Sequence, residues 1–194
     1  PGTYTVAETQ PTAYGDGGQT AGTNGGDDVA VNDEISGITI ASGENTTGYD
    51  FDETLGSLSG VVFNDLDGNG VRDVGEPGLA GIDVELNDGT TTRTATTNAS
   101  GMYVFDSIIA DGPVTISEPT QPAGFVDGSE ILGDAAVSAG SLPAPDDDSI
   151  PGVQISGGQD AVGYDFGEVA AASISGSVVT DANNNGVADG GETG

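Results

Sequence analysis

The stretch from residue 65 to residue 76 reads Asp65-Leu66-Asp67-Gly68-Asn69-Gly70-Val71-Arg72-Asp73-Val74-Gly75-Glu76. Oxygen-bearing side chains occupy its first, third, fifth, ninth and twelfth positions, and a glycine occupies the sixth. Calcium takes about six to eight oxygen ligands, and a tightly wound loop turns alternate side chains inward to supply them. The spacing therefore predicts an EF-hand-like calcium loop. Its expected ligands are Asp65, Asp67, Asn69, Val71 through its carbonyl group, Asp73 and Glu76.

The same spacing occurs a second time, over residues 181–192. One position differs, because an asparagine replaces the aspartate at the third position. The expected ligands of this second loop are Asp181, Asn183, Asn185, Val187 through its carbonyl group, Asp189 and Glu192. The competing interpretation is that Asp-Gly and Asn-Gly pairs only form turns. Two copies in the same register favour the calcium interpretation over that alternative.

The net charge of the chain indicates which kinds of partner it can bind. Its 194 residues include 32 acidic residues and two basic residues, Arg72 and Arg93, which gives a formal charge of −30. Such a charge repels nucleic acid and anionic membrane surfaces, attracts divalent cations and suits a saline setting. No apolar run is long enough to span a bilayer. We therefore expect no nucleic-acid partner and no membrane insertion of this segment.

The residues that are missing are equally informative. The chain has no histidine, cysteine or lysine, so it lacks the usual general bases and nucleophiles of enzymes. We therefore expect it not to be an enzyme. Without cysteine it also has no disulfide, and packing or a metal ion must stabilise the fold.

Short apolar alternations separated by turn residues predict β-strands. Ile82, Val84 and Leu86 alternate in this way, and Asn87-Asp88-Gly89 follows them as a hairpin signal. Residues 58–63 form another strand pattern, directly before the first calcium loop. We expect long surface loops over residues 15–37 and 123–151, because both are rich in glycine and acidic residues.

Self-comparison shows a tandem repeat. Residues 114–118 match residues 4–8, residues 163–166 match residues 48–51, and residues 174–176 match residues 58–60. The period is roughly 110–116 residues, which is domain-sized, and the strand spacing predicts tandem antiparallel β-sandwiches. The expected divisions are the second half of one repeat (1–56), one complete repeat (57–169), and the first strand and calcium loop of another (170–194). We expect the chain to be a window cut from a longer array. In an alternative hypothesis, the two ends complement each other between the subunits of a filament.

Four of these stretches together resemble a known family, the SdrD B-like repeat. The residues that carry the resemblance are Ser59 to Ile82, Thr97 to Phe105, Gly2 to Pro11 and Gly163 to Glu168. The resemblance covers essentially the whole chain. It implies an all-β fold of Greek-key sandwiches of the transthyretin-like or Cna B type, in which the calcium loops lack the flanking helices of a true EF-hand. It also implies large bacterial surface proteins in which calcium rigidifies the repeats and the repeats form a stalk.

The resemblance places further residues in context. Asn98 stands where the family commonly has an aspartate, and its amide oxygen could still serve an additional calcium ion. Three acidic clusters are either further cation sites or solvated loops: Asp27-Asp28, Asp33-Glu34 and Asp146-Asp147-Asp148. Some relatives of the Cna B type carry an internal lysine–asparagine isopeptide bond, but this chain has no lysine to form one.

These observations predict a structural protein. We expect an extracellular, calcium-stabilised repeat that forms a stiff stalk or filament, with neighbouring repeats and further copies of itself as partners. The short links over residues 55–57 and 169–172 favour stiffness, and we expect the calcium loop to lie close to the incoming link. The alternative is an adhesive module that binds a ligand through the long acidic loops. Against this, aromatic residues make up only 5% of the chain and most occupy expected core positions.

Overall fold

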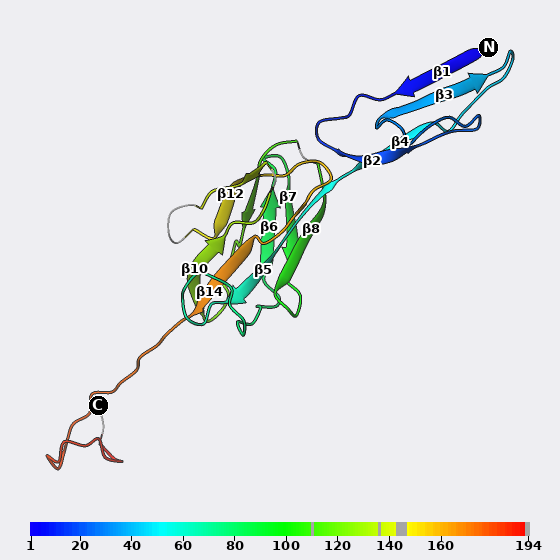
Figure 1. Ribbon diagram of the computed structural model, residues 1–194. Helices are drawn as coiled ribbons and strands as arrows, with labels where there is room; N and C mark the ends of the chain where they lie inside the picture. The colour runs from blue at the N-terminus through cyan, green and yellow to red at the C-terminus, as the bar shows by residue number, and fades with distance from the viewer. Residues whose placement is uncertain (110, 136, 143–146, 193–194) are drawn as a thin grey trace.

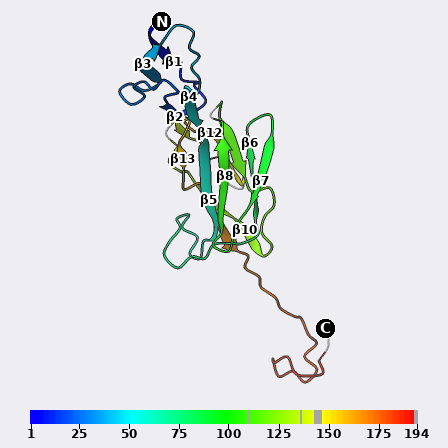
Figure 2. The same ribbon diagram turned by 90° about the vertical axis from the view of Figure 1, so that its right-hand side faces the viewer.

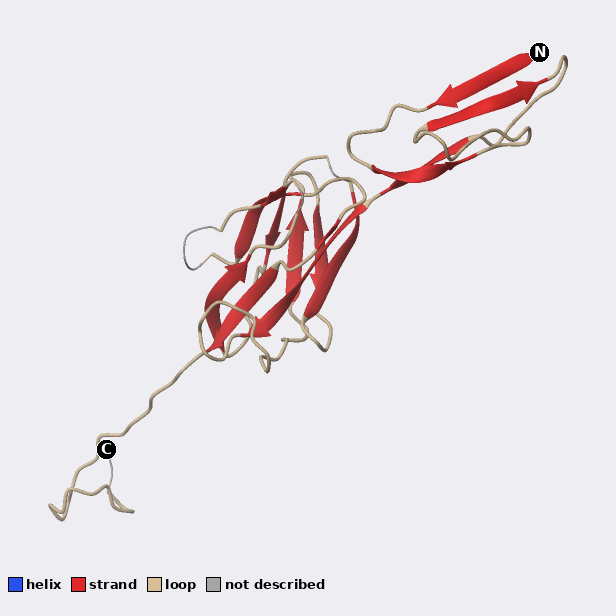
Figure 3. Cartoon of the chain, viewed as in Figure 1, coloured by secondary structure: helices blue, strands red, loops and turns tan. Residues whose placement is uncertain are grey.

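A computed structural model describes residues 1–109, 111–135, 137–142 and 147–192 and shows an all-β protein. Within these residues there are fourteen strands and no helix (Figure 3). In chain order the strands are β1 (Gly2–Ala7), β2 (Gly15–Thr20), β3 (Glu34–Ile40), β4 (Asp50–Thr54), β5 (Gly56–Asn64), β6 (Asp83–Asn87), β7 (Thr92–Thr96), β8 (Met102–Ile108), β9 (Val114–Ser117), β10 (Phe125–Ile131), β11 (Ser138–Ala139), β12 (Ser149–Gln154), β13 (Asp160–Ala161) and β14 (Asp165–Ala170).

Strands β5 to β14 form a sandwich of two sheets. One sheet has the order β10-β14-β5-β13, with β8 on the other side of β5, and the second sheet has the order β11-β12-β9-β6-β7. The two layers are visible in Figures 1 and 2. The prediction of an all-β sandwich is therefore confirmed.

Two pairings depart from the expected antiparallel pattern, since β5 runs parallel to both β13 and β14. Strand β5, the first of the sandwich, runs parallel to β14, the last, with Phe166 opposite Val62 and Glu168 opposite Asn64. The chain therefore enters the sandwich at the start of β5 and leaves it from the opposite end (Figure 1). Local alternation could not predict this direction, because it depends on which distant strands become neighbours.

The core lies between the two sheets. Its buried side chains come from β5, β6, β8, β9, β12, β13, β14 and the residues next to them, and include Leu58, Val84, Ile116, Ile150 and Phe166. Aromatic rings reinforce one layer, since Tyr103 contacts Phe105 edge to face at 5.9 Å between ring centroids. The expectation that most aromatic residues are core residues is correct for the strands of this sandwich.

The first four strands form two separate pairs, β1 with β3 and β2 with β4. These pairs reproduce two pairings of the sandwich, β9 with β12 and β10 with β14. Tyr4 and Val6 on β1 remain 49% and 40% exposed. The same alternation is buried in β9, where the strands of the other sheet cover Val114 and Ile116. This pattern agrees with the half-repeat interpretation, which stays a prediction.

Two sequence expectations about loops were wrong. Residues 15–20 form β2 and β3 begins at Glu34, so residues 15–37 are not a continuous loop. In the same way β10 occupies residues 125–131, and β11 and β12 lie within the supposed loop 123–151. The glycine-rich segment of β2 has little strand propensity of its own, and backbone pairing with β4 makes it a strand, as pairing with β14 does for β10.

The segment that follows the sandwich has no described strand. Residues 171–180 were expected to include the first strand of another repeat, but Ile174 and Val178 are almost fully exposed. This sequence contains no partner strands for them, and a lone strand has no source of backbone pairing or burial.

Candidate metal centre

The first predicted calcium loop follows β5 directly and is wound around Asp65. This residue is buried, and its Oδ1 atom accepts the N–H of Gly68 at 2.8 Å while its Oδ2 atom accepts the N–H of Gly70 at 2.8 Å. Burial opposes ionisation of the carboxyl group, but the N–H donors of Gly70, Gly68 and Asn69 outweigh it, so the pKa of Asp65 lies below its ordinary value. The first ligand position is therefore held as a carboxylate.

The other predicted ligands are drawn into the same loop. Glu76 accepts the N–H of Leu66 through Oε1 and the N–H of Asp73 through Oε2, both at 2.8 Å. Asn69 donates through Nδ2 to Asp67 and to Asp73, and its Oδ1 atom accepts the N–H of Val71. One oxygen each of Asp65, Asp67 and Glu76 lies within 4.8 Å of the others. Such a set of hard oxygens suits a calcium ion, and calcium binding here stays a prediction.

The position of the loop corrects one expectation. The loop lies at the far end of β5 from the incoming link, because β5 separates Leu55 from Asp65. It lies instead beside the outgoing strand, where the N–H of Asp65 donates to the carbonyl group of Glu168 at 2.8 Å. The loop therefore connects the first strand of the sandwich to its last strand at the exit.

The second loop reproduces this geometry outside the sandwich. Asp181 accepts the N–H of Gly186, and Glu192 accepts the N–H groups of Ala182 and Asp189, as Asp65 and Glu76 do in the first loop. Asn183 and Asn185 both donate to Asp189 Oδ2 and hold its pKa below the ordinary value. Val187 donates its N–H to Asn185 Oδ1. The twelve-residue sequence therefore forms the loop through its own hydrogen bonds.

Most of the other side chains considered as cation ligands already accept hydrogen bonds from backbone N–H groups. Asn98 Oδ1 accepts the N–H groups of Ser100 and Met102, so the oxygen already supports its own turn. Asp27 Oδ1 accepts the N–H groups of Val29 and Ala30, and Asp28 accepts that of Ala21. Asp146 lies outside the described residues.

A cluster that the sequence analysis did not assemble lies at the same end of the sandwich. One oxygen each of Asp127, Asp148 and Glu168 lies within 4.8 Å of the others, and Glu118 is their neighbour. Burial and then the charge of Glu168 raise the pKa of Glu118 to about 8. Burial also raises the pKa of Glu168 to about 8, against a hydrogen bond from Gln121 that lowers it. The signal was present in the sequence, because Glu118 and Glu8 end matching strand alternations.

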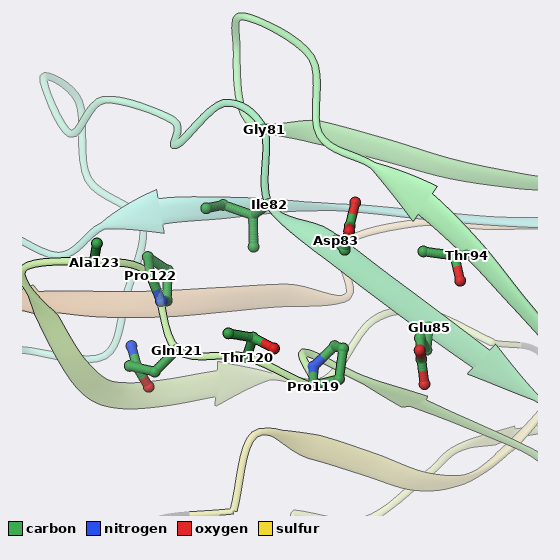
Figure 4. A pocket seen from close by; sticks show the side chains of 10 residues that line it. All are labelled: Gly81, Ile82, Asp83, Glu85, Thr94, Pro119, Thr120, Gln121, Pro122 and Ala123. Carbon is green, nitrogen blue, oxygen red and sulfur yellow. The ribbon is translucent and has the colours of Figure 1, made fainter.

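A pocket lies elsewhere, between β6 and the segment that follows β9. Figure 4 shows Ile82, Asp83 and Glu85 on one side and residues 119–123 on the other. Asp83 accepts a hydrogen bond from Thr96, and none of the described residues that line the pocket is a lysine, arginine or histidine.

The fold and the site together define a class: a β-sandwich repeat domain with an EF-hand-like acidic loop. Comparison with protein families makes this specific, since the model of the SdrD B-like domain matches residues 56–167. The match covers more than half of the 194 residues, and the chain therefore belongs to the SdrD B-like domain family.

Relatives of known name share this region. Serine-aspartate repeat-containing protein F of Staphylococcus epidermidis is 31% identical over 127 residues, which cover 64% of this chain and 8% of that protein. Bone sialoprotein-binding protein of Staphylococcus aureus is 33% identical over 128 residues, which cover 63% of this chain and 11% of that protein. The chain thus spans about a tenth of the length of these relatives.

Two solved structures share part of the fold at low similarity. The Bacillus anthracis TIE protein has a TM-score of 0.42 and 17% identity, over 62% of this chain and 17% of that one. The full-length major pilin SpaD of Corynebacterium diphtheriae has a TM-score of 0.38 and 16% identity, over 60% of this chain and 32% of that one. In the described part of this chain, no helix is long and apolar enough to cross a membrane.

Proposed function

We propose that this chain is a calcium-stabilised segment of a stiff stalk at a bacterial cell surface. The observation that carries the proposal is the placement of the loop over residues 65–76 at the exit of the sandwich, bonded to Glu168 of the last strand. A calcium ion bound there would fix the end of β5 and, through Asp65, the strand from which the chain leaves. Its action would be to stiffen the molecule at the point where the next repeat begins.

The direction of the chain supports an end-to-end array. Entry and exit lie at opposite ends of the sandwich because β5 and β14 are parallel. Repeats joined in this way extend a rod, whereas entry and exit at the same end would fold the chain back. The link at the entry is short, since β4 ends at Thr54 and β5 begins at Gly56.

Direct packing at the entry also supports stiffness. The backbone of Tyr14 and Gly15 lies against Gly157, where an added Cβ atom would be 2.0 Å from the carbonyl carbon of Tyr14. Thr54 lies close to Gly158, with its Oγ1 atom 2.5 Å from a Cβ atom added there. Contacts of this kind between consecutive parts of the chain restrict the hinge more than a one-residue link alone.

The partners and location follow from the same family. Neighbouring repeats of the same chain are the partners that the proposal needs, and lateral association of copies is an extension of it. A cell-surface location rests on membership of a family whose named relatives are staphylococcal repeat proteins. The proposal includes no catalytic role.

The adhesive alternative loses much of its basis in the structure. It relied on a long acidic loop over residues 123–151, and a large part of that segment is strand. The name of one relative says that it binds bone sialoprotein, but this chain covers only 11% of that protein. We therefore place ligand binding outside the proposed function of this segment.

The test is thermal unfolding of the 194-residue chain in EDTA and in calcium chloride. With calcium at about 100 times its dissociation constant, binding only to the folded state adds about 2.7 kcal/mol. For a domain of this size we expect Tm to rise by roughly 10 °C. Glu76→Gln keeps a similar shape but removes a ligand charge, and it should lose at least half of the rise.

The matched control is Glu192→Gln, the same change in the loop outside the sandwich. Calcium bound there has no folded domain to stabilise, so this variant should keep the full rise in Tm. Sodium chloride at equal ionic strength controls for charge screening. An unchanged Tm on addition of calcium, or equal losses in the two variants, would contradict the proposal.

A further inference from the structure

Two glutamates continue the core-facing rows of their strands. Along β9 the inward row runs from Val114 to Ile116 and ends at Glu118, which is 2% exposed. Along β14 it runs from Tyr164 to Phe166 and ends at Glu168, which is 1% exposed. Because successive side chains of a strand alternate between faces, both carboxyl groups are directed between the two sheets. They meet where the apolar core ends.

Most oxygen atoms of these buried carboxyl groups accept no hydrogen bond. Both side-chain oxygens of Glu118, Oε1 of Glu168 and Oδ1 of Asp148 are buried without a hydrogen-bond partner in the described part of the chain. The other oxygen of Glu168 accepts a hydrogen bond from Gln121. Buried polar groups in folded proteins are nearly always paired, so unpaired oxygens that converge on one place indicate a missing partner.

No basic side chain supplies that partner. The charged groups that act on Glu118 are the carboxylates of Glu168, Asp148, Asp127 and Glu130. The two arginines lie elsewhere, since Arg93 pairs with Asp106 at 3.4 Å and Arg72 acts on Asp165. The full sequence contains no lysine or histidine. Only protons or an external cation can offset this concentration of negative charge.

We propose that Glu118, Asp127, Asp148 and Glu168 form a second binding site for a hard divalent cation, with calcium as the expected ion. The three members with oxygens within 4.8 Å of one another are Asp127 in β10, Asp148 directly before β12 and Glu168 in β14, and Glu118 directly follows β9. Oxygen-only ligands select hard cations, and a set of four flexible carboxylates suits the variable geometry of calcium.

The first four strands carry part of the same arrangement. Glu8, Asp16, Asp33 and Glu53 occupy the positions that correspond to the four proposed ligands. The N–H of Glu8 donates to the carbonyl group of Asp33 at 2.9 Å, as that of Glu118 does to Asp148 at 2.9 Å. Gln10 donates to Glu53 as Gln121 does to Glu168. Glu8 Oε2 is again buried without a hydrogen-bond partner.

The proposed ligands come from both layers of the sandwich. A divalent ion bound to them would bridge the two sheets, since β9 and β12 belong to one sheet and β10 and β14 to the other. The site is separate from the loop over residues 65–76, although Glu168 supports both through different groups, its side chain here and its carbonyl group there.

The experiment replaces Asp127 and Asp148, the two partly exposed ligands, because substitutions at partly exposed positions disturb the fold least. Asp127→Asn with Asp148→Asn keeps the shape of both side chains and relieves repulsion, so the metal-free variant should melt at or above the Tm of the original chain. Equilibrium dialysis against calcium at about 1 mM, a concentration at which extracellular sites are filled, should show one bound ion fewer per chain. The matched control is Asp50→Asn with Asp111→Asn, two exposed aspartates whose side chains accept no hydrogen bond in the described part of the chain. This double variant should bind as many ions as the original chain.

A second measurement separates this site from the loop. Glu76→Gln weakens the loop, and the calcium-dependent rise in Tm that remains should disappear when Asp127→Asn and Asp148→Asn are added. The proposal is overturned if the Glu76→Gln variant shows no rise in Tm on addition of calcium. It is also overturned if adding Asp127→Asn and Asp148→Asn changes neither the remaining rise in Tm nor the number of ions bound per chain. Either result is independent of whether the loop itself binds calcium.

Discussion

Gly60 shows how one residue can limit this fold. It lies in β5 where the backbone of β14 passes so closely that an added Cβ atom would be 1.6 Å from the carbonyl oxygen of Tyr164. The same oxygen accepts the hydroxyl group of Tyr103 at 2.6 Å, and the N–H of Tyr164 donates to Ser59 at 3.2 Å. A single glycine thus allows three strands of one sheet to share a hydrogen-bonded centre.

Gly60→Ala should therefore destabilise the sandwich. The methyl group would push β14 away from β5 and break the hydrogen bonds around Tyr164, at a cost of about 1–3 kcal/mol from overpacking. Urea unfolding at fixed calcium concentration measures this difference. Gly176→Ala is the matched control, because Gly176 occupies the corresponding position in the C-terminal segment and has no atom within 4 Å of an added Cβ. Equal stability of the two variants would show that the close approach is absent in solution.

At the scale of elements, the hairpin between β6 and β7 is fixed by one carboxylate. Asp88 Oδ1 accepts the hydroxyl and N–H groups of Thr90 and the N–H of Thr91, and Oδ2 accepts the hydroxyl group of Thr91. These bonds, first that from the Thr90 side chain, hold the pKa of Asp88 well below its ordinary value. The sequence signal Asn87-Asp88-Gly89 predicted this turn correctly.

The lowered pKa gives the hairpin a pH dependence of definite sign. The folded state binds the proton of Asp88 less readily than the unfolded chain, so its contribution is fully present above the ordinary pKa of about 3.9 and declines as the pH falls below it. Asp88→Ala should thus be less stable than the original chain at pH 6, and the difference should shrink towards pH 2.5. Urea midpoints in metal-free buffer measure it, with Asp111→Ala as the exposed control. A difference that stays constant with pH would contradict this account.

The two acidic loops show what an element can encode by itself. The loop over residues 65–76 belongs to a packed sandwich, and the loop over residues 181–192 follows a segment without strands, yet both form the same internal hydrogen bonds. Burial differs, since Asp65 is 2% exposed and Asp181 is more accessible. The conformation of the loop is therefore determined by its own sequence, whereas the burial of its first expected ligand depends on the surrounding sandwich.

At the scale of the whole molecule, the close packing of Tyr14 and Gly15 on Gly157 is the feature that would restrict bending. Gly157 is not among the residues with positive φ, so an alanine is compatible with its backbone. Its methyl group would nevertheless collide with the backbone of Tyr14. The contact can thus be removed without straining the turn that contains it.

Gly157→Ala should leave Tm of the sandwich nearly unchanged and broaden the angle between the first four strands and the sandwich. The chain has no cysteine, so Thr39→Cys and Thr94→Cys supply two exposed sites for spin labels. Pulsed electron resonance then measures the distribution of distances between them. Gly190→Ala, at a glycine with open space around it, is the control. The same narrow distribution in both variants would show that this packing does not limit bending.

The sequence by itself determined the strands with regular apolar alternation, the hairpin at Asp88, the all-β class and the local form of both acidic loops. Each of these depends on residues close together in the chain, whose side-chain period or hydrogen-bonding groups already carry the information. Tertiary structure alone decided three further features: the parallel pairing of β5 with β14, the pairing that makes β2 and β10 strands, and the meeting of Glu118, Asp127, Asp148 and Glu168. The physical reason is common to all three, because backbone pairing and the convergence of carboxylates depend on which distant segments become neighbours when the core is buried.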